Sequence, residues 1–128
     1  MKREKLKITA RCPIRTTTDL IGGEWKLLIL FQLAPEPLRP SQLKRLIPDI
    51  SEKMLIQELK ALTDSNLVLR KNFGEIPPRV EYELTSIGHK IMPLIDEMQN
   101  FANIYEHEII TNQKIIKKDI TGHDKEVG

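Results

Sequence analysis

The sequence contains a single cysteine, Cys12, and three histidines that lie far apart. One cysteine excludes an intrachain disulfide and a zinc site built from cysteines, so we expect a reduced compartment or an intermolecular role for the thiol. No histidine has a second histidine or a cysteine at metal-ligand spacing; the three are His89, His107 and His123. We therefore predict neither a metal site nor a cofactor.

Long hydrophobic runs are also missing. The longest, residues 27–31, is far shorter than the roughly 20 residues that cross a bilayer. No apolar stretch of secretory type follows the basic N-terminus before Cys12-Pro13. We therefore expect a cytoplasmic protein that has no membrane partner.

The chain is long enough for one hydrophobic core. It has 128 residues, of which 40% are hydrophobic, and this leaves little for a second core. The last residues are polar, with few large apolar side chains. We predict one domain over residues 1–112, followed by a polar tail over residues 113–128 that frays.

The net charge of +2 conceals an uneven distribution along the chain. The charge is +5 over residues 1–18, −2 over residues 19–38, +3 over residues 39–79 and −4 over residues 80–128. Basic side chains thus collect in the first and middle thirds. This is expected if those parts contact a polyanion and the acidic C-terminal third does not.

Glycines and prolines divide the first part of the chain into two helices. Residues 16–19 offer N-caps for a short helix that Gly22-Gly23 stops. A second helix restarts at Glu24 and ends at Pro35. Its predicted apolar face consists of Trp25, Leu28, Ile29, Phe31, Gln32 and Leu33. We interpret the aromatic residues Trp25 and Phe31, together with Tyr82, as core.

Two further helices follow a short extended piece at residues 38–39. Ser41 is the predicted N-cap of a helix that runs to about residue 46, and Ser51 caps the next helix, which runs to about residue 64. In the second of these helices a buried stripe recurs at spacings of four and three, at Leu55, Leu59 and Leu62. The opposite face then carries Glu52, Lys53, Ile56, Gln57 and Lys60.

The next segment predicts a β-hairpin. Asn66 suits a left-handed helix stop, after which residues 67–73 and 80–84 have the composition of strands. In the second strand apolar residues alternate with Glu81 and Glu83, which is typical of a half-buried strand. The connection, residues 74–79, is too long for a two-residue turn, and its proline pair stiffens it into a finger ending in Arg79.

A last helix is predicted to begin after Thr85 and to run past Tyr105, with a kink at Pro93. Its apolar stripe consists of Ile91, Leu94, Ile95, Met98, Phe101, Ala102, Tyr105 and Ile109. Little of the chain is left to cover so long a stripe. We therefore expect a partner chain to cover it.

This order of elements predicts an α+β fold, mostly α: a winged helix-turn-helix with an added C-terminal dimerisation helix. Residues 41–46 form the supporting helix. Residues 51–64 enter the major groove of DNA, which is about 12 Å wide and admits one helix, while the hairpin tip reaches phosphates or the neighbouring minor groove. Residues 1–112 are then a winged-helix domain for DNA binding and dimerisation.

Four motifs resemble a known family. They are Cys12-Pro13-Ile14, residues 19–25 (Asp-Leu-Ile-Gly-Gly-Glu-Trp), residues 50–55 (Ile-Ser-Glu-Lys-Met-Leu) and residues 77–88, which begin Pro-Pro-Arg-Val-Glu-Tyr. Over residues 12–105 the chain resembles the HxlR-type transcriptional regulators, relatives of the MarR group. The resemblance implies a homodimer that binds duplex DNA. The chain departs from many relatives in having Glu24 for lysine and Asn66 for glycine.

The candidate DNA contacts lie on the two helices and the hairpin. They are Ser41, Gln42, Ser51, Lys53, Met54, Ile56, Gln57, Lys60 and Arg79. Gln57 suits pairing with adenine and Ile56 suits a thymine methyl, whereas lysines more often contact phosphate. The alternative for this helix face is an ordinary solvated surface. For Arg79 the alternative is a strand-end cation paired with Glu81 or Glu83.

Cys12 is either an inert buried residue or a thiol sensor. It lies between Arg11 and Arg15, and nearby cations favour the reactive thiolate. In some members of the family that the chain resembles, the cysteine of the Cys-Pro motif responds to electrophiles or oxidants. A small electrophile at Cys12, or a disulfide to Cys12 of a second subunit, is therefore a candidate signal.

The sequence as a whole predicts a homodimeric regulator of transcription, without enzymatic activity, that binds a pseudo-palindromic operator. Its recognition helices would enter successive major grooves about 34 Å apart. The alternative is a winged-helix module that binds a protein and no DNA. An enzyme is disfavoured because no histidine lies near Cys12 in the sequence to serve as its base.

Overall fold

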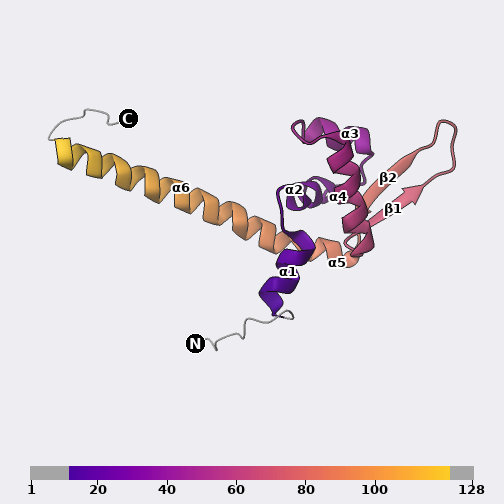
Figure 1. The fold of residues 1–128 in the computed structure, drawn as a ribbon, viewed down its shortest axis with the longest axis horizontal. Helices are drawn as coiled ribbons and strands as arrows, with labels where there is room; N and C mark the ends of the chain where they lie inside the picture. The colour runs from indigo at the N-terminus through magenta and orange to yellow at the C-terminus, as the bar shows by residue number, and fades with distance from the viewer. Residues whose placement is uncertain (1–11, 122–128) are drawn as a thin grey trace. The chain divides into compact units, whose positions relative to one another are not determined.

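The computed structural model describes residues 12–121, and their side chains as far as Gln113. The elements follow one another as α1 (Pro13–Ile21), α2 (Lys26–Leu33), α3 (Pro40–Leu46), α4 (Glu52–Asp64), β1 (Val68–Asn72), β2 (Val80–Leu84), α5 (Ser86–His89) and α6 (Met92–Thr121) (Figure 1). The chain divides into two compact units, one up to Met92 and one from Pro93 onward. The predicted winged helix-turn-helix with a long C-terminal helix is confirmed.

Helix α1 begins earlier than predicted. Pro13 occupies its first position, where a missing N–H is harmless, and Cys12 is the N-cap residue. Instead of capping the helix, the hydroxyl of Thr17 donates to the Pro13 carbonyl one turn back, at 2.8 Å. The predicted stop is confirmed, because Gly22 is the C-cap and donates its N–H to the Thr18 carbonyl at 2.7 Å.

The apolar face predicted for α2 is partly wrong. The helix begins at Lys26, and its buried residues are Ile29, Leu30 and Leu33. Leu28 and Phe31 are exposed by 46% and 38%. The run of five apolar residues at 27–31 has no period from which a face can be read, so the packing of the other elements decides which residues are buried. Trp25 is also partly exposed, whereas Tyr82 belongs to the core as predicted.

Helix α3 has a different cap from the predicted one. Pro40 stands at the first helical position, and Arg39 is the N-cap residue. The side-chain oxygen of Gln42 accepts the backbone N–H of Arg39 at 2.8 Å, which satisfies the chain at the helix start. Ser41 is therefore an exposed residue within the first turn.

Helix α4 has the predicted bounds and the predicted buried stripe. Ser51 is its N-cap, and its Oγ accepts the backbone N–H of Met54 at 3.0 Å. Leu55, Leu59 and Leu62 are all buried. After the helix Asn66 has φ +68°, and the N–H of Leu67 donates to the Leu62 carbonyl, so the predicted left-handed stop is confirmed.

The hairpin pairs β1 with β2 in antiparallel register, from Val68 opposite Leu84 to Asn72 opposite Val80. The predicted extended piece before α3 joins its edge. Leu38 exchanges two backbone hydrogen bonds with Tyr82, at 2.9 and 2.8 Å. The hairpin is thereby fixed to the segment that leads into the helix-turn-helix.

The predicted last helix is interrupted. The short helix α5 has Thr85 as its N-cap, and α6 starts only at Met92. Pro93 lies in the first turn of α6, so it starts a helix where we predicted a kink, because the first turn is the part of a helix that tolerates proline. Helix α6 continues to Thr121, past the boundary predicted at residue 112. Fraying of the tail stays a prediction, and residues 122–128 lie outside the described range.

An ion pair connects α2 to α4. The ammonium of Lys26 lies 3.2 Å from the Glu58 carboxylate and donates to both of its oxygens. The two side chains are only 18% and 14% exposed. Glu58 stands beside the buried leucine stripe, so this pair helps to set how α4 is held against the rest of the domain.

Substituting Lys26→Met should lower the free energy of unfolding by about 1–3 kcal/mol, because the largely buried Glu58 carboxylate loses its partner. The double variant Lys26→Met/Glu58→Met should recover most of that loss. Urea unfolding at one protein concentration measures both effects. As a control, Lys60→Met removes an exposed ion pair and should change the stability little. An equal loss in the single and the double variant would contradict the role of the pair.

Candidate nucleic-acid interface

The side of α4 opposite its leucine stripe faces solvent. All five of the residues predicted for it are exposed, namely Glu52, Lys53, Ile56, Gln57 and Lys60, and Met54 is partly exposed. We call this outward side of α4 the recognition face. At its N-terminal end the N–H of Met54 is already bonded to Ser51, so that hydrogen-bond donor is not free for a ligand.

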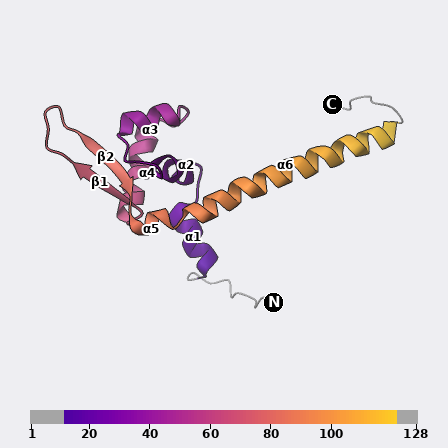
Figure 2. The same cartoon turned by 180° about the vertical axis from the view of Figure 1, so that it is seen from behind.

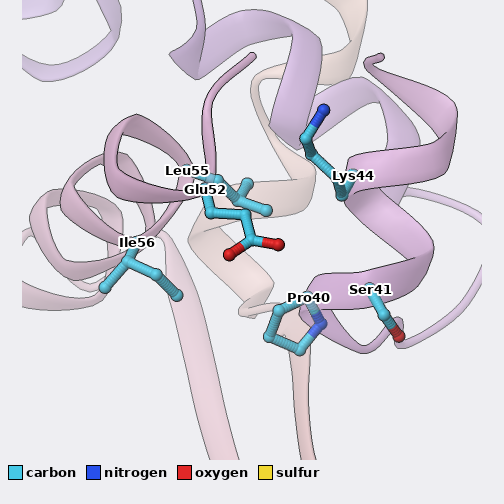
Figure 3. A pocket seen from close by; sticks show the side chains of 6 residues that line it. All are labelled: Pro40, Ser41, Lys44, Glu52, Leu55 and Ile56. Carbon is cyan, nitrogen blue, oxygen red and sulfur yellow. The ribbon is translucent and has the colours of Figure 1, made fainter. Parts of the chain in front are cut away.

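Two hollows border the recognition face. One, of about 350 Å³, lies between α3 and α4 (Figure 3), and its lining residues are Pro40, Ser41, Lys44, Glu52, Leu55 and Ile56. The other, of about 330 Å³, is lined by Ile56, Lys60, Thr63, Asp64, Arg70 and Tyr82. Ile56 borders both hollows. The middle of α4 is therefore a ridge, which is the shape that a helix needs to enter a groove.

The cations of this face differ in their partners. Lys53 forms no ion pair with any residue in the described part of the chain. Lys60 lies 2.8 Å from Asp64 with both side chains exposed, and the hydrogen bond and the charge of Asp64 raise the pKa of Lys60. Lys44 donates to the Pro48 carbonyl at 2.8 Å and so ties α3 to the turn that follows it.

Arg79 pairs with carboxylates of its own hairpin, as in the alternative interpretation of a strand-end cation. Its guanidinium lies 3.2 Å from Glu75 and 3.8 Å from Glu81, and its Cζ is 3.9 Å from the centre of the Phe73 ring. The other predicted partner, Glu83, instead pairs with Lys71 at 2.7 Å. The cation at the end of the finger is thus held within the hairpin.

The loop between the strands is the wing tip, residues 73–79, and it lies at the far end of the hairpin from α5 (Figure 2). The N–H of Phe73 donates to the Arg79 carbonyl at 3.0 Å and closes the loop. Ile76, in the middle, is 99% exposed. Neither Ile76 nor Arg70 was predicted as a site residue, because the periodicity of a strand says nothing about which side chains of a hairpin border a ligand.

Cys12 is buried, with 3% of its surface exposed. Arg15, one of the two cations that flank it in the sequence, is exposed, and Arg11 lies outside the described residues. Among the residues described, no group of three or more histidine, cysteine, aspartate or glutamate side chains is placed to hold a metal ion.

The predicted stripe of α6 is mostly exposed. Its exposed members are Leu94, Met98, Phe101, Ala102 and Tyr105, whereas Ile91 and Ile109 are partly exposed and Ile95 is buried. The rings of Phe101 and Tyr105 are 6.1 Å apart. Ile104 and Ile110 are exposed as well, although the predicted stripe did not include them. Within residues 12–121 no helix has the length and apolar content to cross a bilayer.

Known proteins share this arrangement. The family model of the HxlR-like helix-turn-helix matches residues 20–109. The HTH-type transcriptional regulator YkvN of Bacillus subtilis (strain 168) is 39% identical over an aligned length of 112 residues, and the match covers 81% of this chain and 95% of YkvN.

Two solved structures are similar in fold. A MarR-family protein of Porphyromonas gingivalis W83 has 46% identity and a TM-score of 0.71, over 78% of this chain and 96% of that one. The quinone-bound YodB of B. subtilis has 32% identity and a TM-score of 0.61, over 70% and 94% of the two chains. The chain described here is a helix-turn-helix transcriptional regulator and belongs to the HxlR-like family, as its motifs predicted.

Proposed function

We propose that the protein acts in the cytoplasm as a homodimer that binds a pseudo-palindromic operator, with α4 of each subunit in the major groove. The observation that carries this proposal is the recognition face of α4, a ridge of polar side chains around Ile56 that lies between two hollows, on a helix whose leucine stripe is buried. The proposed contacts are Ser41, Gln42, Ser51, Lys53, Met54, Ile56, Gln57 and Lys60.

The residues on this face have different chemical roles. The Gln57 amide can both donate to and accept from an adenine edge, and Ile56 offers an apolar contact for a thymine methyl. Lys53 forms no ion pair with a carboxylate among the described residues. It is therefore the strongest candidate for a phosphate contact. Lys60 must share its charge between Asp64 and DNA.

Substituting Lys53→Ala should reduce the slope of log affinity against log salt by about one, because one phosphate contact and its counterion release are lost. The measurement uses a duplex selected from a random library with the full-length protein. Lys90→Ala, which removes an exposed lysine after α5, is the matched control and should leave the slope unchanged. If the protein shows no salt-dependent binding to any duplex, the protein-interaction module is favoured instead.

The exposed apolar side chains of α6 support the proposed homodimer. Leu94, Met98, Phe101 and Tyr105 recur at spacings of four, three and four, so they share one side of the helix. All four are at least 40% exposed. A second copy of the same helix would cover these side chains and pair the two subunits about a two-fold axis.

Substituting Met98→Asp should give monomers, because it places an unpaired charge in the proposed apolar interface. The monomers should also lose specific binding to the selected duplex. Light scattering measures the oligomeric state. Asn103→Asp is the control: Asn103 is two residues from Phe101, so it points away from the stripe, and its substitution should leave the dimer intact. If Met98→Asp forms a dimer as stable as that of the parent, the dimer interface does not include this stripe.

We propose a second property, regulation through Cys12. The similarity to a structure of YodB with bound quinone supports it. In the proposed reaction the Cys12 sulfur would add to a ring carbon of a quinone. The thiol proton would pass to a quinone oxygen, which gives a hydroquinone bonded to the sulfur. Because Cys12 is buried, the adduct cannot form without local rearrangement at the start of α1. Such a rearrangement would alter the register of the two recognition helices.

Quinone or diamide treatment should weaken DNA binding by the parent and leave Cys12→Ser unaffected, since the chain has no other cysteine. Affinity for the selected duplex before and after treatment measures the response. Adding Ser86→Cys to the Cys12→Ser variant supplies an exposed thiol elsewhere and should not restore the response. If the parent and Cys12→Ser respond alike, Cys12 is no sensor.

A further inference from the structure

The wing tip carries the most exposed large hydrophobic side chain of the described residues. Ile76 is 99% exposed, whereas the next, Phe101, is 67% exposed. Pro77 and Pro78 beside it are exposed as well, so the tip is an apolar ridge of three residues. Nothing in the fold of the domain requires an isoleucine at this position, because its side chain contributes nothing to the core.

Arg79 holds this ridge in place. Its guanidinium contacts the Glu75 and Glu81 carboxylates and the Phe73 ring, and its carbonyl accepts the N–H of Phe73. These contacts join the two ends of the loop on either side of Ile76. They also engage the cation of the tip. The outermost side chain is thus the apolar Ile76, and the Glu75 carboxylate beside it is 55% exposed and paired with Arg79.

We infer that Ile76 is a specificity-determining residue that packs into the minor groove beside each half-site and disfavours G·C pairs there. This inference rests on the proposed function. The hairpin follows α4 in the chain, with β1 beginning four residues after α4 ends, and a hairpin beside a helix in the major groove can reach the neighbouring minor groove with its tip. Arg79 is the positioning residue for this contact.

The chemistry of the minor groove gives the direction of the preference. There A·T and T·A pairs present only acceptors, whereas G·C adds the N2 amino donor of guanine. An apolar side chain that covers this amino group removes water from a donor and offers no acceptor, which is unfavourable. Apolar side chains such as isoleucine do serve as minor-groove contacts in other proteins. Discrimination by Ile76 should therefore be insensitive to salt.

The test uses the full-length protein and a duplex selected with it from a random library. Hydroxyl-radical cleavage locates the minor-groove contacts, and the base pairs there are replaced by A·T, G·C or inosine·C. Inosine·C keeps the major-groove edge of G·C but lacks the N2 amino group. We expect the parent to bind the A·T and inosine·C duplexes about tenfold more tightly than the G·C duplex.

Ile76→Ala should lose this discrimination while its salt slope stays that of the parent, and Ile76→Val should retain most of it. Lys53→Ala is the matched control, since it should lower the salt slope and keep the discrimination. Arg79→Ala should weaken the discrimination with no change in slope. If its slope falls by about one instead, Arg79 is a phosphate contact and its assignment as a positioning residue is wrong.

The outcomes separate this inference from the proposed function. If Ile76→Ala discriminates as well as the parent on the same duplex, operator binding stands and the role of Ile76 is overturned. If Ile76→Ala changes the oligomeric state and not the discrimination, the tip is a contact between subunits and the inference is equally overturned. If selection returns no duplex, the proposed function fails, and the inference with it. Because Ile76 is exposed, the thermal unfolding midpoints of the Ile76 variants should match that of the parent.

Discussion

The burial of one side of α4 is the constraint on which the rest of the structure depends. Leu55, Leu59 and Leu62 are buried, and a helix with a period of 3.6 residues cannot hide that stripe without turning its other side outward. The Lys26–Glu58 pair adds a polar attachment next to the stripe. Rotation of α4 about its axis would expose leucines and bury cations, so the orientation of the recognition face is fixed by the core and requires no ligand.

Several cations of α4 and the hairpin are paired with carboxylates, which limits the electrostatic attraction of this part of the protein to DNA. Lys60 has Asp64 beside it, Lys71 has Glu83, and Arg79 has two glutamates. A phosphate that contacts any of these cations must compete with a carboxylate already in place. Such competition lowers the affinity for DNA of arbitrary sequence, which is governed by charge, more than it lowers the affinity gained from shape and base contacts. In the proposed complex a regulator with a net charge of only +2 would then depend on fit, to which Ile56, Gln57 and Ile76 at the wing tip would contribute.

Much of this fold could be predicted from the sequence, namely where a local pattern is compatible with a single structure. Ser51 before a leucine stripe, Asn66 after it and alternation around Tyr82 each gave the observed structure. The rules failed where the sequence permits two answers. Five consecutive apolar residues left the buried side of α2 open, and Pro93 suits both a kink and a helix start. The loop at Ile76 is beyond such rules, since its exposure and the contacts of Arg79 follow from a closed backbone that no periodicity encodes.

The two-fold symmetry of the proposed dimer would make the recognition face and the wing tip act together. In the proposed complex one α4 would present few side chains to base edges, so a single subunit could specify only a short sequence. Two copies about an axis read that sequence twice in inverted order, which is why a pseudo-palindrome is the matching operator. The wing tips then lie at symmetric positions beside the two half-sites. An apolar contact there rejects G·C pairs without adding charge, and it thereby lengthens the sequence that the dimer specifies while adding little to its affinity for other DNA.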